Sequence, residues 1–165
     1  MVENSTGHKH REEIHSLVHS WLAEESWTIK ELADLQAAWA MEAIDPANRI
    51  IVVAQRSKSL DQIVIQAAIG FTERDQQRFA QLPSQERTDF LWDLRFKLLQ
   101  SGVLFDGMSE PLQRVVVTQR IYYDGLTKDA FLQRVTLILN ALLLVLWTLA
   151  RKFQEPPSAH PSMVH

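Results

Sequence analysis

The fold is decided by the stretch RVVVTQRIYYDGLTKDAFLQRVTLILNALLLVLWTLA, residues 114–150. Over its first ten residues apolar and polar side chains alternate, which is the period of a half-buried β-strand. The polar side of this strand carries Arg114, Thr118, Arg120 and Tyr122. We expect these four side chains to form one row on the outer face of a sheet, where they can bind an acidic or extended partner. A solvated strand face would have the same composition.

This strand is followed by a turn and a long helix. Asp124-Gly125 has the composition of a tight turn, and Thr127 is placed to cap the helix that follows. Residues 135–150 are apolar on every face of that helix, so one sheet cannot cover all of them. Leu144 and Trp147 are therefore predicted to meet a second subunit or another partner, while Trp39 and Trp92 are interpreted as core or interface anchors.

The same apolar run has to be compared with a membrane span. Sixteen residues lie between Arg134 and Arg151. At 1.5 Å per residue they cover roughly 24 Å, against a hydrocarbon core of about 30 Å. Asn140, in the middle of the run, would be costly in lipid. We therefore expect a buried or interface helix and no membrane partner, with a tail-anchored protein as the alternative.

Composition sets the class of protein. A chain of 165 residues with 46% apolar content can bury one core. We expect a single domain over residues 11–154, with disordered ends at 1–10 and 155–165. A net charge of −3 gives no general attraction to nucleic acid. The absence of cysteine excludes disulfides and thiolate sites, and the polar N-terminus lacks the apolar core of a secretory signal. A cytoplasmic protein without a cofactor is expected.

Periodicity and turn residues predict the remaining elements. They comprise a first helix with an apolar stripe from Ile14 to Leu22, a hairpin of strands at 49–55 and 62–71, two helical segments separated at Pro83, and a short strand at 103–105. Thr72 with Asp75 is a capping-box pattern that begins the first helical segment. Gly102 ends the second segment, whose buried stripe is predicted to be Phe90, Leu91, Leu94 and Leu98. Between residues 28 and 44 the patterns conflict. Thr28 and Glu31 form a capping-box pattern that favours helix, whereas residues 37–43 alternate as in a strand. Local propensity favours helix.

Three short segments carry a resemblance to known domains: residues 21–25 (WLAEE), residues 121–127 (IYYDGLT), and Phe131 before the apolar helix. Together with the element order, they resemble small uncharacterised bacterial and archaeal domains of the YbjN-like and DUF2299-like kind, with the fold of class I type III secretion chaperones. The resemblance implies an α+β fold, an antiparallel sheet with helices in the order α-β-β-β-α-β-β-α, and a strand at 37–44. It also implies chaperone-like binding, although one fold can carry unrelated functions.

The best catalytic or metal candidate is a histidine group near the N-terminus. On a helix, Glu12, His15 and His19 lie on adjacent turns, and the i, i+4 spacing allows two imidazoles to share one ion. Glu12 and His19 fall on the solvent side of that helix, and the sequence places no further ligand beside them. A solvated face is therefore the preferred interpretation.

No catalytic motif accompanies this group. The chain has no G-x-S-x-G elbow, no phosphate-binding glycine loop and no H-E-x-x-H pair. The sequence therefore predicts a non-enzymatic, chaperone-like module that binds a protein or peptide and forms a homodimer. The alternatives are a small metal-dependent enzyme that uses the histidine group and the tail-anchored membrane protein.

Overall fold

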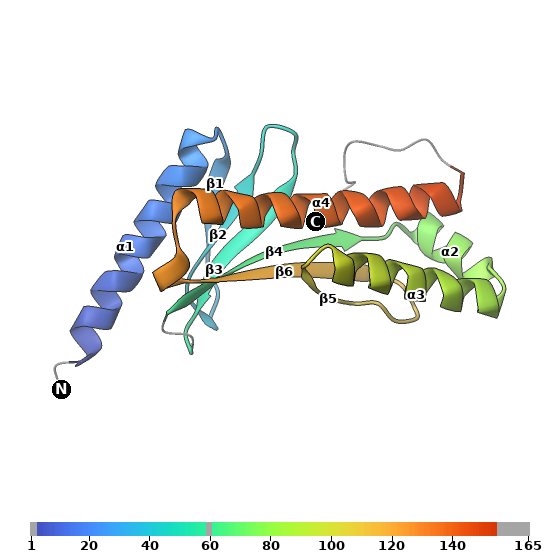
Figure 1. Ribbon diagram of the computed structural model, residues 1–165, viewed down its shortest axis with the longest axis horizontal. Helices are drawn as coiled ribbons and strands as arrows, with labels where there is room; N and C mark the ends of the chain where they lie inside the picture. Colours follow the sequence, from blue (N-terminus) through green and yellow to red (C-terminus); the bar gives the residue numbers. More distant parts are fainter. Residues whose placement is uncertain (1–2, 59–60, 155–165) are drawn as a thin grey trace. The chain divides into compact units, whose positions relative to one another are not determined.

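The structure is a computed structural model that describes residues 3–58 and 61–154, with side chains from residue 10 onward. Its elements (Figure 1) are α1 (Glu3–Glu24), β1 (Thr28–Leu32), β2 (Ala37–Ile44), β3 (Ile50–Arg56), β4 (Gln62–Gly70), α2 (Glu73–Gln81), α3 (Ser84–Gln100), β5 (Leu104–Asp106), β6 (Arg114–Tyr122), the 3-10 turn η1 (Tyr123–Gly125) and α4 (Lys128–Lys152). The strands form one six-stranded antiparallel sheet in the order β1-β2-β3-β4-β6-β5. The α+β class and the antiparallel sheet are confirmed.

The structure corrects the expected order of elements in two places. Thr28 and Glu31 lie in β1, a strand that the expected order lacks, so the capping-box interpretation is wrong. β1 pairs with β2 along its whole length, with Thr28 opposite Ile44 and Glu31 opposite Met41. The ladder of hydrogen bonds outweighs a local helix signal worth a few tenths of a kcal/mol per residue. In addition, the expected order counts a single helix after the hairpin, whereas the two helical segments predicted on either side of Pro83 are the separate helices α2 and α3.

The strand over Ala37–Ile44 is confirmed at its expected bounds. α1 begins at Glu3, within the segment 1–10 for which disorder was expected. The expected disordered tail at 155–165 lies outside the described residues. Contacts divide the chain into two compact units. One contains the residues up to 65 together with 120–135, and the other contains residues 66–119 together with those from 136 onward.

In the first unit, α1 lies against β1 and β2. Ile14, Val18 and Leu22 form its buried face, as the stripe predicted, while Leu17 from the same stripe is exposed. Burial of such side chains contributes about 1.5–3 kcal/mol each. The start of α4 belongs to this unit, and Thr127 caps it by accepting a hydrogen bond from the Ala130 N–H at 3.1 Å, as expected.

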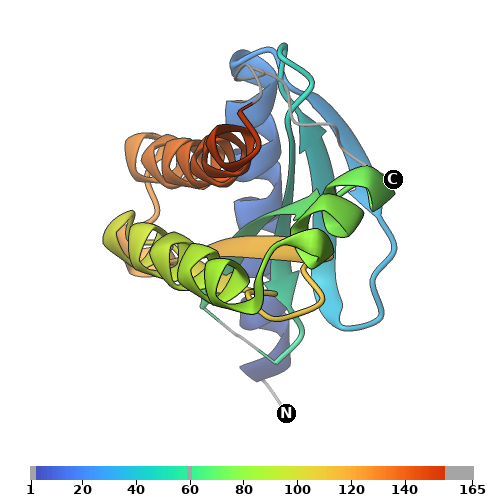
Figure 2. The same ribbon diagram turned by 90° about the vertical axis from the view of Figure 1, so that its right-hand side faces the viewer.

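In the second unit, α3 and the second half of α4 lie side by side (Figure 2). Lys152 near the end of α4 contacts Glu86 near the start of α3 at 2.7 Å, so the two helices run in opposite directions. The buried face of α3 consists of the four predicted residues, Phe90, Leu91, Leu94 and Leu98. Phe79 of α2 packs edge-on against Phe90, with ring centroids 5.6 Å apart.

Two glycines shape the second unit where the backbone enters the left-handed region. Gly102, at φ +76°, ends α3 as the sequence predicted. Gly107, at φ +88°, follows β5 and lies so close to the Arg114 carbonyl that a Cβ there would overlap it. Only glycine fits both the dihedral angle and the space.

Candidate functional site

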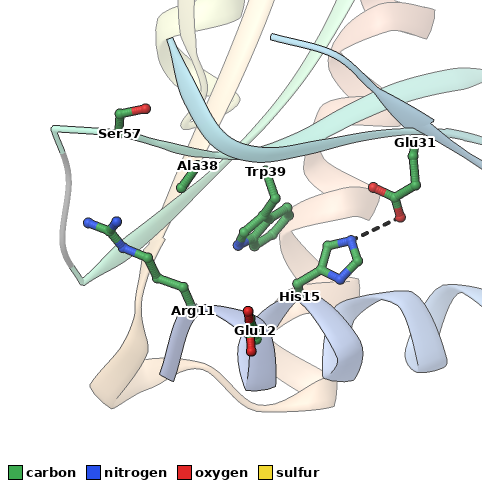
Figure 3. A pocket seen from close by; sticks show the side chains of 7 residues that line it. All are labelled: Arg11, Glu12, His15, Glu31, Ala38, Trp39 and Ser57. Carbon is green, nitrogen blue, oxygen red and sulfur yellow. Dashed lines mark hydrogen bonds and ion pairs between the residues drawn. The ribbon is translucent and has the colours of Figure 1, made fainter. Parts of the chain in front are cut away.

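A pocket of about 400 Å³ lies in the first unit, between α1 and the strands (Figure 3). Its lining residues come from α1, β1, β2 and the turn after β3, and they are Arg11, Glu12, His15, Glu31, Ala38, Trp39 and Ser57. The pocket therefore includes Glu12 and His15 from the predicted histidine group, whereas His19 is exposed on α1 and does not line it.

His15 is bound to a carboxylate that the sequence analysis did not find. Its Nε2 lies 2.9 Å from Oε1 of Glu31, and its ring meets Trp39 edge-on, with centroids 5.2 Å apart. The ring of His19 is 6.4 Å from that of His15. Among the described residues, no three His, Cys, Asp or Glu side chains are grouped so that they could hold a metal ion. The arrangement is a His–Glu pair on the rim of a cavity.

Two buried nitrogen donors of the pocket residues have no hydrogen-bond partner in the part of the chain that the structure describes, Nε of Arg11 and Nε1 of Trp39. A buried donor that lacks an acceptor costs about 1–3 kcal/mol. The register of β2 against β3 shifts between Ala37 and Trp39, and such a bulge re-aims the side chains beside it. Figure 3 shows the indole nitrogen on the side of the Trp39 ring that faces Arg11. Arg11 and Trp39 therefore line the same pocket, each with one buried donor.

A second polar pair lies on the sheet beside this pocket. Gln55 is opposite Trp39 in the β2–β3 ladder and is fully buried. Its Oε1 accepts a hydrogen bond from the Tyr123 hydroxyl, and the Tyr123 ring lies 5.0 Å from that of His10. Burial raises the pKa of the Tyr123 hydroxyl, and the nearby Arg11 charge opposes that rise. No pattern in the sequence indicates that Tyr123 has Gln55 as a buried partner.

The predicted row on β6 is found on one face of the strand. Arg114, Arg120 and Tyr122 are exposed, and Thr118 is half-buried. The Thr118 hydroxyl accepts a hydrogen bond from Gln66 Nε2 at 3.2 Å. β6 lies between β4 and β5 in the sheet, but β5 pairs only with Val116–Thr118, so beyond these residues β5 does not cover the backbone of β6. The binding role of this row stays a prediction.

α4 buries one face and leaves part of its apolar surface uncovered. Val135, Ile138, Leu142 and Val145 are buried. Leu144 is half-buried and Trp147 is 51% exposed. By length and composition α4 is also long enough to cross a membrane, a property that the core helix of a soluble protein shares. The contact expected at Leu144 and Trp147 stays a prediction.

The most exposed apolar row of the second unit lies on α3. Trp92, Phe96 and Leu99 are 52%, 57% and 67% exposed. Their i, i+4, i+7 spacing places them on one side of the helix, opposite the buried face. The rings of Trp92 and Phe96 are 5.8 Å apart, so the side chains form a continuous surface. We call these three residues the α3 stripe.

The sequence analysis missed the α3 stripe, although a signal was present. The same spacing rule that selected the buried face of α3 also connects Trp92 with Phe96 and Leu99. In α4 the apolar residues beyond those needed for one buried face are evident from the sequence, because they are continuous there. In α3 they are interleaved with charges such as Asp93, Arg95 and Lys97.

Comparison with known proteins places the chain in a family. The model of a family described as an uncharacterized conserved protein, DUF2299, matches residues 14–149. The chain is also similar to an uncharacterized protein from Methanothermobacter thermautotrophicus whose crystal structure is known. The identity is 29%, the TM-score is 0.78, and the match covers 84% of this chain and 97% of that chain. No curated protein matches. Since the family model covers the chain from α1 to the end of α4, this protein belongs to the DUF2299 family.

Proposed function

We propose that this protein is a non-enzymatic, chaperone-like binding module that holds an apolar segment of another protein on the α3 stripe. The observation that carries the proposal is the exposure of Trp92, Phe96 and Leu99 along one side of a well-packed helix. Contiguous exposed apolar patches with a polar rim mark protein-interaction sites. Tryptophan in particular is enriched among the residues that dominate binding energy.

The charges beside the stripe support an apolar occupant. The Arg95 guanidinium lies over the Trp92 ring at 4.8 Å and donates to the Met108 carbonyl. Lys97 is paired with Asp93 at 2.6 Å. Because these groups already have partners within the chain, a segment on the stripe is selected by its apolar surface. Selection by apolar character, without a fixed charge pattern, is what a chaperone-like module requires.

The experiment is a test of aggregation suppression. The protein is mixed with reduced insulin, which aggregates when its chains separate, and light scattering is followed with wild type and with Trp92→Ser, Phe96→Ser and Leu99→Ser. Each stripe variant is expected to lose most of the suppression. Leu35→Ser is the matched control, because Leu35 is a fully exposed leucine in the loop between β1 and β2 and lies outside the stripe.

Equal suppression by wild type and by all three stripe variants would contradict the proposal. A second outcome concerns the occupant. If the stripe variants instead lower the mass measured by analytical ultracentrifugation, the stripe is covered by a second copy of the chain, and the proposed client site is wrong.

We further propose that the module works in the cytoplasm as a homodimer that uses α4. Leu144 and Trp147 support this proposal, because an exposed tryptophan beside a half-buried leucine is typical of a subunit contact. Leu144→Glu and Trp147→Glu are each expected to convert a dimer into a monomer in sedimentation, while Gln133→Glu on the exposed polar part of α4 is not. A monomeric wild type would defeat the homodimer and leave the client test unaffected.

A further inference from the structure

We infer that the pocket between α1 and the strands is a binding site for a small molecule that carries both a carboxylate and a protonated amine, as a free amino acid does. The carboxylate is held by Arg11 and the indole N–H of Trp39, and the amine faces the carboxylates of Glu12 and Glu31. This site is separate from the α3 stripe, and its chemistry does not depend on the proposed function.

The two unpartnered donors carry the first half of the inference. Nε of Arg11 and Nε1 of Trp39 both belong to residues that line the pocket, and both are buried and lack an acceptor among the described residues. Buried donors in folded proteins are almost always satisfied. These two belong to residues that line one pocket, and the indole nitrogen is on the side of the Trp39 ring that faces Arg11 (Figure 3). A ligand carboxylate has two oxygens, so it can accept from both. A hydrogen bond from a cation to a carboxylate is also about twice as strong as a neutral one.

The charge distribution carries the second half. The pocket contains one guanidinium, from Arg11, and two carboxylates, from Glu12 and Glu31. A purely anionic ligand would be attracted to Arg11 and repelled by both glutamates. In a molecule with separated positive and negative groups, the negative group is attracted to Arg11 and the positive group to the two glutamates. Glu31 is held in place by His15 at 2.9 Å, so its carboxylate is oriented before a ligand arrives.

Size and wall composition agree with this class of ligand. About 400 Å³ is within the range of small-molecule sites and suits a ligand the size of an amino acid. The Trp39 ring and Ala38 supply apolar wall for a side chain, and the Ser57 hydroxyl is a further polar group on the lining.

The test uses the indole N–H signal of Trp39 in a ¹⁵N-labelled full chain. The chain has five tryptophans, and the Trp39 signal is assigned by its loss in Trp39→Phe. Three probes are titrated: L-phenylalanine, N-acetyl-L-phenylalanine, which lacks the charged amine, and phenethylamine, which lacks the carboxylate. L-Phenylalanine is expected to shift the Trp39 signal in a saturable way, the acetylated probe to bind several-fold more weakly, and phenethylamine to leave the signal unchanged.

Calorimetry on variants then assigns the residues. Arg11→Gln is expected to weaken L-phenylalanine binding ~tenfold or more, the size of one charge-assisted hydrogen bond. Trp39→Phe keeps a ring in the pocket and removes only the donor, so it is expected to weaken binding several-fold. Arg74→Gln, an exposed arginine on α2, is the matched control and is expected to bind as wild type does.

Two outcomes would overturn the inference. If no probe moves the Trp39 signal at millimolar concentration, the two donors do not bind a carboxylate and the pocket is not a site of this class. If phenethylamine binds as tightly as L-phenylalanine, and Arg11→Gln changes the affinity for neither probe, the assignment of a carboxylate site to Arg11 and Trp39 is wrong. Circular dichroism of each variant separates loss of binding from loss of folding. Because insulin suppression is measured on another surface, its failure would leave this result standing.

Discussion

The pocket in the first unit and the α3 stripe in the second depart from ordinary protein surfaces in opposite ways. Among the described residues of the pocket, two polar nitrogens are buried without hydrogen-bond partners. On the stripe, three large apolar side chains are exposed although the same helix has a complete buried face. The buried donors of the pocket lack acceptors among the described residues, and the side chains of the α3 stripe lack an apolar surface that covers them. The difference indicates two kinds of ligand, one small and charged and the other large and apolar.

The largest effect is expected for the stability of two leucine variants in α3, and it tests whether the α3 stripe is a free surface. Leu94 is fully buried and Leu99 is 67% exposed on the other side of the same helix. Leu94→Ala is expected to lower the free energy of unfolding by about 2–5 kcal/mol, because it leaves a cavity in the core. Leu99→Ala is expected to change it by less than about 0.5 kcal/mol. Urea denaturation measures both.

A large loss of stability in Leu99→Ala would mean that the stripe packs within the chain. The stripe could then not serve as a binding surface, and the contrast with the pocket would disappear. Leu98→Ala, at a fully buried neighbouring position, should behave like Leu94→Ala.

The next effect concerns the polar side of the comparison. Tyr123→Phe removes the donor to buried Gln55 Oε1 and is expected to cost about 1–2 kcal/mol of stability. The pKa of the Tyr123 hydroxyl is raised, chiefly by burial, so the folded state holds this proton more tightly than the unfolded chain. That contribution is complete below the unfolded value of 10.0 and is lost as pH rises through the folded value.

The measurement for Tyr123 is stability against pH on the alkaline side, from about pH 9 to 11. Wild type should lose stability more steeply than Tyr123→Phe across this window. The pKa of Lys128 is also raised, mainly by its hydrogen bond with Glu24. That effect is present in both proteins and cancels in the difference. Parallel curves would show that the hydroxyl has no differential interaction in the folded state.

The smallest effect belongs to an exposed ion pair of the first unit. Lys128 Nζ lies 2.5 Å from Glu24 Oε2, and its hydrogen bond lowers the pKa of Glu24 from 4.5. The pair's contribution is therefore present above the unfolded value and is lost as pH falls through the folded one. Lys128→Met should flatten the acid limb of the stability curve slightly, and added salt should reduce the difference. An acid limb unchanged by Lys128→Met would show that the pair contributes nothing measurable.

The capping patterns show how far the sequence could predict this fold. Thr72 with Asp75 predicted a helix start, and the Thr72 hydroxyl does accept from the Asp75 N–H at 3.1 Å. Thr28 with Glu31 has a similar spacing but lies in β1. The two patterns differ only in what lies beside them in space. A strand partner such as β2 is invisible to a local pattern, and the strand at 37–44 was assigned from family resemblance.

The candidate sites also differ in whether a local pattern could predict them. Exposure of the β6 row could be predicted, because alternation within one strand is a local property. The pocket could not, since it joins His15 to Glu31 across sixteen positions and places Trp39 beside Arg11 through a bulge. The metal interpretation of Glu12, His15 and His19 rested on helix spacing alone, and spacing does not show which carboxylate the sheet brings to His15.

β1 is the outermost strand of the sheet, next to β2 alone. An outermost strand presents unpaired backbone groups that can recruit strands from other chains. Lys30 and Glu31 are exposed on β1, and charges at such positions oppose that recruitment. Glu31 would thus keep the protein soluble as well as orient His15. Neutralising both charges should turn this edge into a starting point for aggregation even where the fold itself is intact.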